Sequence, residues 1–101
     1  MSLNARERER TRAELQRAFE LVGRDADAVA ADLDVTPDRL RRTVAVDDAD
    51  PADVWLLRDY LVQAAADLDR GPVVFTVLTD AARAQADAWF DLRRAPRRDT
   101  P

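Results

Sequence analysis

Apolar residues recur along this chain at the three- and four-residue spacing that places them on one face of an α-helix. The first segment with this pattern covers residues 5–22. Its apolar stripe consists of Leu15, Ala18, Phe19 and Val22. The earlier half of the segment, up to Arg12, carries spaced opposite charges and no stripe. We therefore predict a long helix whose second half faces a core and whose first half is a solvated extension or a partner surface.

Residues with strong positional preferences mark the ends of this helix. Asn4 and Glu7 have the spacing of a capping box, and Gly23 favours the left-handed conformation that ends a helix. Asp25 can then cap a second helix over residues 26–33. The inward positions of this second helix are Val29, Ala30 and Leu33.

A third helix is predicted to start at Pro37, because Thr36 is a good N-cap and proline is favoured at the first helical position. Its predicted buried residues are Leu40 and Val44. Residues 5–45 would then form a unit of three helices.

The fourth predicted helix covers residues 51–70. Asp50 is its N-cap and Pro51 its first residue, while Gly71 and Pro72 are typical of a helix end. Its apolar residues occupy more than one face. Such a helix lies either at the centre of a fold or in a dimer interface.

Residues 73–78 are the one strongly β-prone run in the sequence, Val-Val-Phe-Thr-Val-Leu. A single strand is unstable. We therefore expect this segment to pair either with residues 43–46 or with the same segment of a second chain.

The last predicted helix is rich in alanine. Thr79 or Asp80 can cap it, and it is expected to extend through Trp89, Phe90 and Leu92. Residues 93–101 contain four Arg and two Pro and are expected to be disordered. The prediction is a single, mainly α-helical domain over residues 1–92.

The composition excludes several kinds of chemistry. All 16 basic residues are Arg, and the chain has no Lys, His or Cys. It therefore lacks a thiolate nucleophile, a Ser-His-Asp triad, a Schiff-base lysine and a Cys/His zinc site. We expect a non-enzymatic protein without a cofactor. No apolar run is long enough to span a membrane, and a cytoplasmic location is expected.

The charge is unevenly distributed. Residues 1–24 carry six Arg and four Glu, whereas residues 47–70 carry two Arg and seven Asp. The net charge is −4. An acidic middle argues against non-specific binding of polyanions, which requires a basic face.

Residues 26–44 have the spacing of a helix-turn-helix motif. Ala30 is the small residue of the first helix, and Asp34 stands where a left-handed turn residue is needed. Val35 and Leu40 fit the apolar positions that follow, and the last apolar position falls on Thr43. The front half of the chain is therefore predicted to be helix-turn-helix-like.

In such a unit the exposed start of the second motif helix enters the major groove of DNA. The candidate DNA-contacting residues are Thr36, Arg39, Arg41 and Arg42. Arginine can bind guanine edges with two hydrogen bonds, and a threonine hydroxyl can reach a phosphate. Against this, Asp38 lies among them and would repel phosphate. The alternative, which we favour, is a solvated face in which these arginines balance the nearby aspartates.

Two hypotheses follow. The first is a DNA-binding transcriptional regulator that acts as a homodimer through residues 51–70 and 73–78. The second is a non-enzymatic protein-interaction module on the same helical scaffold, favoured by the acidic surface of residues 25–70. The aromatic side chains are expected in the core, since aromatics at helical spacing in a small domain seldom line a ligand pocket.

Several ordered motifs resemble one bacterial family. They include the Met1–Asn4 start, the Trp-Leu-Leu-Arg-Asp-Tyr-Leu run of residues 55–61, the Pro-Val-Val-Phe-Thr-Val-Leu run of residues 72–78 and the Trp89-Phe90 pair. The chain resembles domain of unknown function 2316 over about residues 1–92. The resemblance implies a mostly helical, cytoplasmic bacterial protein with a helix-turn-helix-like front half. Because the family has no assigned activity, it supplies no site residue.

The family-like run also contains Arg58 between apolar residues. It could contact a ligand or partner. We favour a buried arginine that pairs with an acidic neighbour and holds residues 51–70 against the C-terminal segment.

Overall fold

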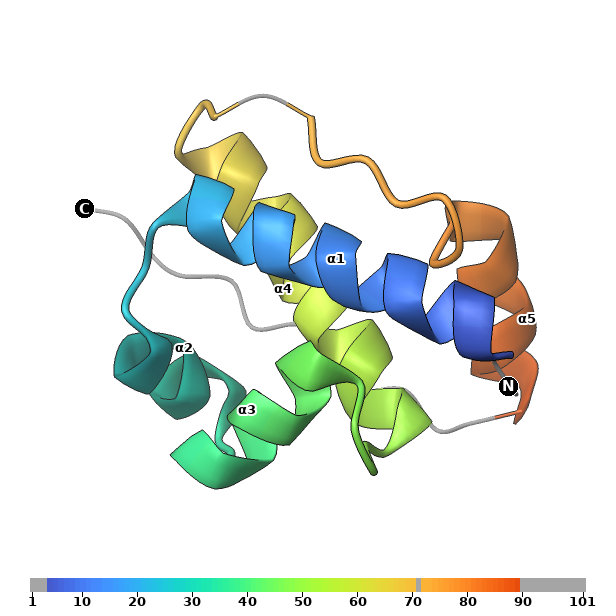
Figure 1. Cartoon of the computed structure of the whole chain (residues 1–101). Helices are drawn as coiled ribbons and strands as arrows, with labels where there is room; N and C mark the ends of the chain where they lie inside the picture. The colour runs from blue at the N-terminus through green and yellow to red at the C-terminus, as the bar shows by residue number, and fades with distance from the viewer. Residues whose placement is uncertain (1–3, 71, 90–101) are drawn as a thin grey trace.

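The computed structural model describes residues 4–70 and 72–89, with side chains up to residue 86. Within these residues there are five helices: α1 (Ala5–Val22), α2 (Ala26–Leu33), α3 (Pro37–Ala45), α4 (Pro51–Asp67) and α5 (Asp80–Trp89). In Figure 1, α1 lies across α4, α2 and α3 pack beside this pair, and the segment after α4 passes along α1 to reach α5. The prediction of a mainly helical protein is confirmed.

The predicted capping residues determine the ends of α1. The Asn4 side chain accepts a hydrogen bond from the Glu7 amide, and the Glu7 side chain accepts one from the Asn4 amide. Gly23 ends the helix with φ of 71°. The positive φ favours glycine here, and a Cβ atom added at Gly23 would also displace the Arg70 guanidinium, which lies 2.7 Å from its position.

The next two helices also begin where the sequence predicts. Asp25 occupies the N-cap position of α2, but its side chain makes no capping hydrogen bond. Thr36 does cap α3, since its hydroxyl oxygen accepts from the Arg39 amide. Asp34 adopts the left-handed conformation with φ of 57°, as the turn between the two helices requires.

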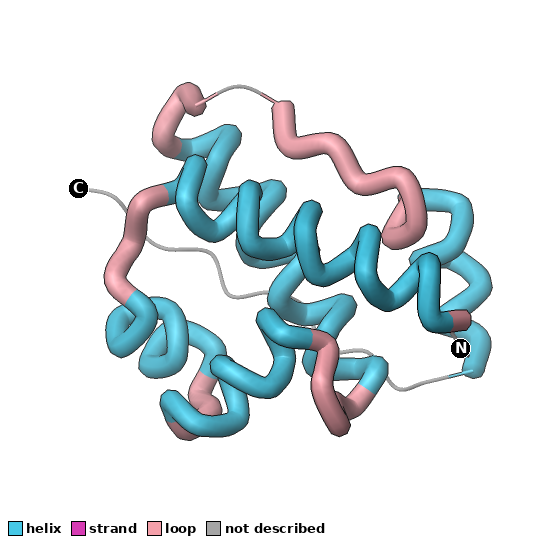
Figure 2. Tube along the Cα trace, viewed as in Figure 1, coloured by secondary structure: helices cyan, strands magenta, loops and turns pink. Residues whose placement is uncertain are grey.

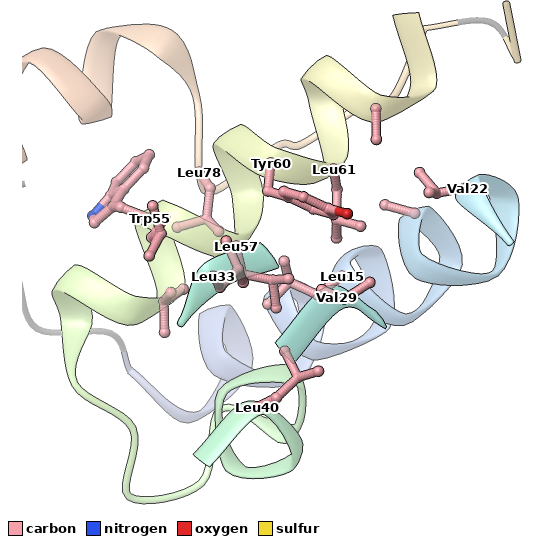
Figure 3. Close-up of a cluster of buried hydrophobic side chains, with 14 of the residues drawn as sticks. Leu15, Val22, Val29, Leu33, Leu40, Trp55, Leu57, Tyr60, Leu61 and Leu78 are labelled. Atoms are coloured by element: carbon pink, nitrogen blue, oxygen red, sulfur yellow. The ribbon is translucent and has the colours of Figure 1, made fainter. Parts of the chain in front are cut away.

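The core is built around α4. Trp55, Leu57 and Leu61 are completely buried, and α1 contributes the equally buried Leu15. Figure 3 shows these side chains together with Leu78 and with residues of α2 and α3. Burial of each large apolar side chain contributes about 1.5–3 kcal/mol, so this helix is the main source of stability.

The apolar residues of α4 that suggested a dimer interface are buried within one chain. Leu56 and Tyr60, which lie outside the main stripe, are 3% and 2% exposed. The helix is therefore central to the fold, which was one of the two alternatives that its pattern left open.

The structure corrects the end of α4 from residue 70 to Asp67. Asp69 adopts a left-handed conformation with φ of 53°, and the Arg70 amide donates back to the Ala65 carbonyl. The Arg70 guanidinium then donates to the Val22 carbonyl at 2.9 Å. The helix therefore ends early because Asp69 adopts the left-handed conformation that glycine usually takes at this point. The Arg70 guanidinium in turn provides a hydrogen-bond donor for a carbonyl group at the end of α1.

The predicted β-like segment at residues 73–78 is wrong, because these residues form no strand and are drawn as a loop in Figure 2. One proposed partner, residues 43–46, lies in α3 and its C-cap. Phe75 and Leu78 are buried whereas Val74 is 68% exposed. The Thr76 amide and hydroxyl both donate to the Glu14 carboxylate on α1. The burial of Phe75 and Leu78 and the hydrogen bonds from Thr76 to Glu14 hold the segment in place without a β-sheet.

Thr79 caps α5, since its hydroxyl accepts from the Ala82 amide at 3.1 Å. The predicted continuation of this helix through Phe90 and Leu92 lies outside the described residues, as does the predicted tail at residues 93–101.

Arg58 has the structural role that the sequence favoured. Its side chain is 10% exposed, and its guanidinium donates to the Leu78 carbonyl at 3.1 Å, to Asp59 at 2.9 Å and to Asp80. Arg83 of α5 binds the other oxygen of Asp59 at 2.7 Å. This network joins α4 to the loop and to α5.

Tyr60 joins α4 to α2. Its hydroxyl donates to the Asp32 carboxylate at 2.5 Å and accepts from Arg24 at 3.0 Å. Burial raises the pKa of Tyr60 above its ordinary value of 10.0, and the hydrogen bond to Asp32 raises this pKa further, whereas Arg24 lowers it.

The chain contains one tyrosine, so tyrosinate absorbance reports on Tyr60 alone. We expect a titration midpoint above pH 10 in the folded protein. The folded chain holds this proton more tightly than the unfolded chain does, so the associated stability is complete below pH 10 and is lost as pH rises through the folded-state pKa. Asp32→Asn should lower the midpoint, and circular dichroism verifies folding. A wild-type midpoint at or below 10 would contradict the assignment.

Candidate functional site

The four residues predicted to contact DNA all lie on or next to α3. The hydroxyl oxygen of Thr36 is engaged in capping this helix, 3.1 Å from the Arg39 amide nitrogen. The three arginines follow within the first two turns of α3. The structure therefore brings the predicted residues together, and the partners of each arginine decide what this surface can do.

Arg39 is held by a residue of α4. Its guanidinium forms two hydrogen bonds with the Asp53 carboxylate, at 2.6 and 2.7 Å. The Asp53 side chain is 11% exposed. This hydrogen-bonded carboxylate raises the pKa of Arg39 above its ordinary value. Arg39 therefore links α3 to the first turn of α4, and two of its guanidinium nitrogens are engaged by Asp53 although the side chain is 47% exposed.

Arg41 and Arg42 share one carboxylate. Both pair with Asp38 one turn earlier in α3, Arg42 at 3.5 Å. The Arg41 side chain is 78% exposed and that of Arg42 is 47% exposed. Exposed pairs of this kind are weak. They nevertheless halve the positive charge that this helix presents.

The buried face of α3 differs from the prediction by one residue. Leu40 is buried as expected, but Thr43 is buried and Val44 is only partly buried. The Thr43 hydroxyl donates to the Arg39 carbonyl at 2.8 Å, which satisfies it inside the helix. Thr43 can therefore occupy the core position, and Val44 turns toward the space between α3 and α1.

That space is an open groove of about 500 Å³ between α1 and α3. Phe19 of α1 and Leu40 and Val44 of α3 form its apolar lining. The other lining residues are Gln16, Ala26, Pro37, Asp38, Arg41 and Ala45. Arg12 contacts the lining residue Ala45, because its guanidinium donates to the Ala45 carbonyl at 2.6 Å. The arrangement presents a mostly apolar surface with an exposed arginine at its rim.

Sequence reasoning missed this groove. It placed Phe19 and Val44 in the core, and both are only partly buried. The available signal was in the short third helix, where Thr43 and Val44 are adjacent candidates for the buried position one turn after Leu40. When the apolar face of a helix is wider than its contact with the core, a residue at the edge of that face stays partly exposed.

A second, polar hollow of about 210 Å³ lies where α3 meets α4. The Arg39–Asp53 pair lines it, together with Arg42, Thr43, Asp48, Ala49 and Asp50. Its guanidinium groups would repel a cation. Across the described residues, no three acidic side chains are grouped so that they could hold a metal ion.

The sequence model of a bacterial family, described as "uncharacterized protein conserved in bacteria" and designated domain of unknown function 2316, matches residues 1–91. The chain belongs to this family. No curated protein and no solved structure matches the chain. Among the residues that the structure describes in this family member, no helix is both long and apolar enough to cross a bilayer.

The Arg39–Asp53 pair predicts a measurable cost in stability for this family member. Asp53→Asn keeps the shape but removes the charge that holds the guanidinium, and we expect the free energy of unfolding to fall by about 1–2 kcal/mol. Denaturant unfolding measures this change.

The matched control is Asp38→Asn, which removes an exposed carboxylate from the same surface and should change stability by less than about 0.5 kcal/mol. Equal effects of the two variants would show that the Asp53 pair is no stronger than a surface pair.

Proposed function

We propose that this chain is a non-enzymatic protein-interaction module that binds a partner in the groove between α1 and α3. The observation that carries the proposal is the groove itself, whose apolar lining includes the partly buried Phe19 and Val44 on two helices that pack against the core. Open apolar patches on small proteins commonly mark interaction sites.

The charge on α3 supports a protein partner over DNA. Asp53 holds Arg39, and Asp38 offsets Arg41 and Arg42. The exposed residues of α2 and its two caps include Asp25, Asp27 and Asp34. A DNA-reading surface requires a basic face. The lack of Cys, His and Lys supports a role without catalysis.

Two exposed alanines of α2 provide a direct test. Ala26 lines the groove and Ala31 does not, so the same change can be made inside and outside the site. We expect proteins captured from an extract of its own cells by the wild type to be retained by Ala31→Glu and lost by Ala26→Glu. Glutamate is favourable near a helix N-terminus, so Ala26→Glu should fold.

Quantitative mass spectrometry of the captured proteins, with melting curves for each variant, provides the measurement. Identical sets of captured proteins for the two variants would place the interaction outside the groove.

DNA binding by a helix-turn-helix unit is the second candidate. The observation in its favour is Arg41, which lies in the first half of α3 with its side chain 78% exposed. If this candidate is correct, the protein shifts genomic DNA fragments, including its own promoter, in a gel at low salt. The double change of Arg41→Ala and Arg42→Ala abolishes the shift, and Arg17→Ala leaves it intact. Absence of any shift at low salt would exclude it.

A homodimer through residues 51–70 and 73–78 stays a prediction. Within the described part of that surface, Val74 is the one large apolar side chain that is strongly exposed. The proposed module accordingly acts through α1 and α3 whether or not the chain dimerises.

A further inference from the structure

We propose that the groove between α1 and α3 binds a short amphipathic helix of a partner protein, and that an acidic side chain of this helix pairs with Arg41. This inference rests on the proposed function and adds the chemistry of the partner.

The geometry of the groove favours a helix. Its α3 wall presents Pro37, Leu40 and Val44 at the i, i+3 and i+7 spacing, and Phe19 faces them from α1. Between Pro37 and Ala45 this wall is about 12 Å long at 1.5 Å per residue, which matches two to three turns of a docked helix. Small-molecule sites enclose most of their ligand, whereas this groove is open along its length.

The charges around the groove favour an acidic partner near Arg41. Arg41 is itself a lining residue, and Arg12 contacts the lining residue Ala45. The one acidic lining residue, Asp38, already serves both Arg41 and Arg42. Arg41 and Arg42 together therefore carry one more positive charge than Asp38 offsets, and Arg41 is the one of the two that lines the groove.

The lining residue Ala26 of α2 has acidic neighbours in the sequence, the exposed Asp25 and Asp27. An acidic residue on the partner is therefore favoured beside Arg41 and disfavoured beside Ala26.

A second copy of the chain is a poor occupant. Among the described residues, the large apolar side chains that are strongly exposed are Leu21 and Val74, at 39% and 68%. Val74 lies in a loop, so these two do not form a stripe on one helix. Up to residue 86, where side chains are described, there is therefore no exposed apolar helix face that could fill the groove of a second copy.

The test uses two synthetic helical peptides of about twelve residues with the full-length protein. Both carry leucine at i, i+3 and i+7, and they differ at one flanking position, which is Glu in the first peptide and Arg in the second. Fluorescence anisotropy at low salt measures the affinities. We expect the Glu peptide to bind about fivefold more tightly than the Arg peptide.

Charge reversal on the protein locates the contact. Arg41→Glu should invert the preference, so that the Arg peptide binds more tightly. Arg17→Glu makes the same change on an exposed residue of α1 outside the groove, and it should keep the wild-type preference. Because both arginines are exposed, neither change should unfold the protein, and melting curves verify this.

Amide shifts in NMR spectra locate the bound peptide independently. Shifts centred on Phe19, Val44 and Ala45, together with inverted preference in Arg41→Glu alone, would support the inference. Equal binding of both peptides to wild type and variant, or shifts centred on α5, would overturn it. If neither peptide binds while Ala26→Glu still abolishes capture of cellular proteins, the helical partner is refuted and the proposed function stands. If neither peptide binds and Ala26→Glu captures the same cellular proteins as the wild type, the helical partner and the proposed function are both refuted.

Discussion

The burial of α4 on more than one of its faces is the constraint on which the other elements depend. Trp55, Leu57 and Leu61 are inaccessible to solvent, so α1, α2, α3 and the loop before α5 must each cover part of one helix. A helix that is apolar on several faces leaves little freedom in how the shorter helices pack around it. Polar side chains then join these elements to α4: Asp53 to α3, Tyr60 to α2 and Arg58 to the loop and α5.

These polar links explain why the surface of α3 is less basic than its sequence. Asp53 binds Arg39 and links α3 to α4, and the single carboxylate of Asp38 offsets half of the positive charge of Arg41 and Arg42. The same packing has a second consequence. Because Thr43 can satisfy its own hydroxyl inside the helix, it takes the core position, and Val44 is left facing α1. The groove and the reduced positive charge of α3 therefore have a common origin in the way α3 packs on α4.

The parts of the fold that were predictable from sequence are those governed by local chemistry. Asn4 with Glu7, Gly23 and the Thr36–Pro37 pair fix helix ends through hydrogen bonds and backbone angles within a few residues, and the structure agrees with each. The errors arose where distant residues decide. Gly71 and Pro72 looked like the end of α4, but Asp69 turns the chain first because Arg70 reaches back to α1.

The candidate site shows the same division. The sequence placed Arg39, Arg41 and Arg42 together on one short helix, because helical spacing is local. It could not show that Asp53, fourteen residues after Arg39, would bind its guanidinium, because that contact exists only once α3 has packed on α4. Spacing alone therefore identified a surface but not its charge, and charge is what separates a DNA-reading helix from one that docks another protein. On this chain the ion pairs within the fold favour the second reading.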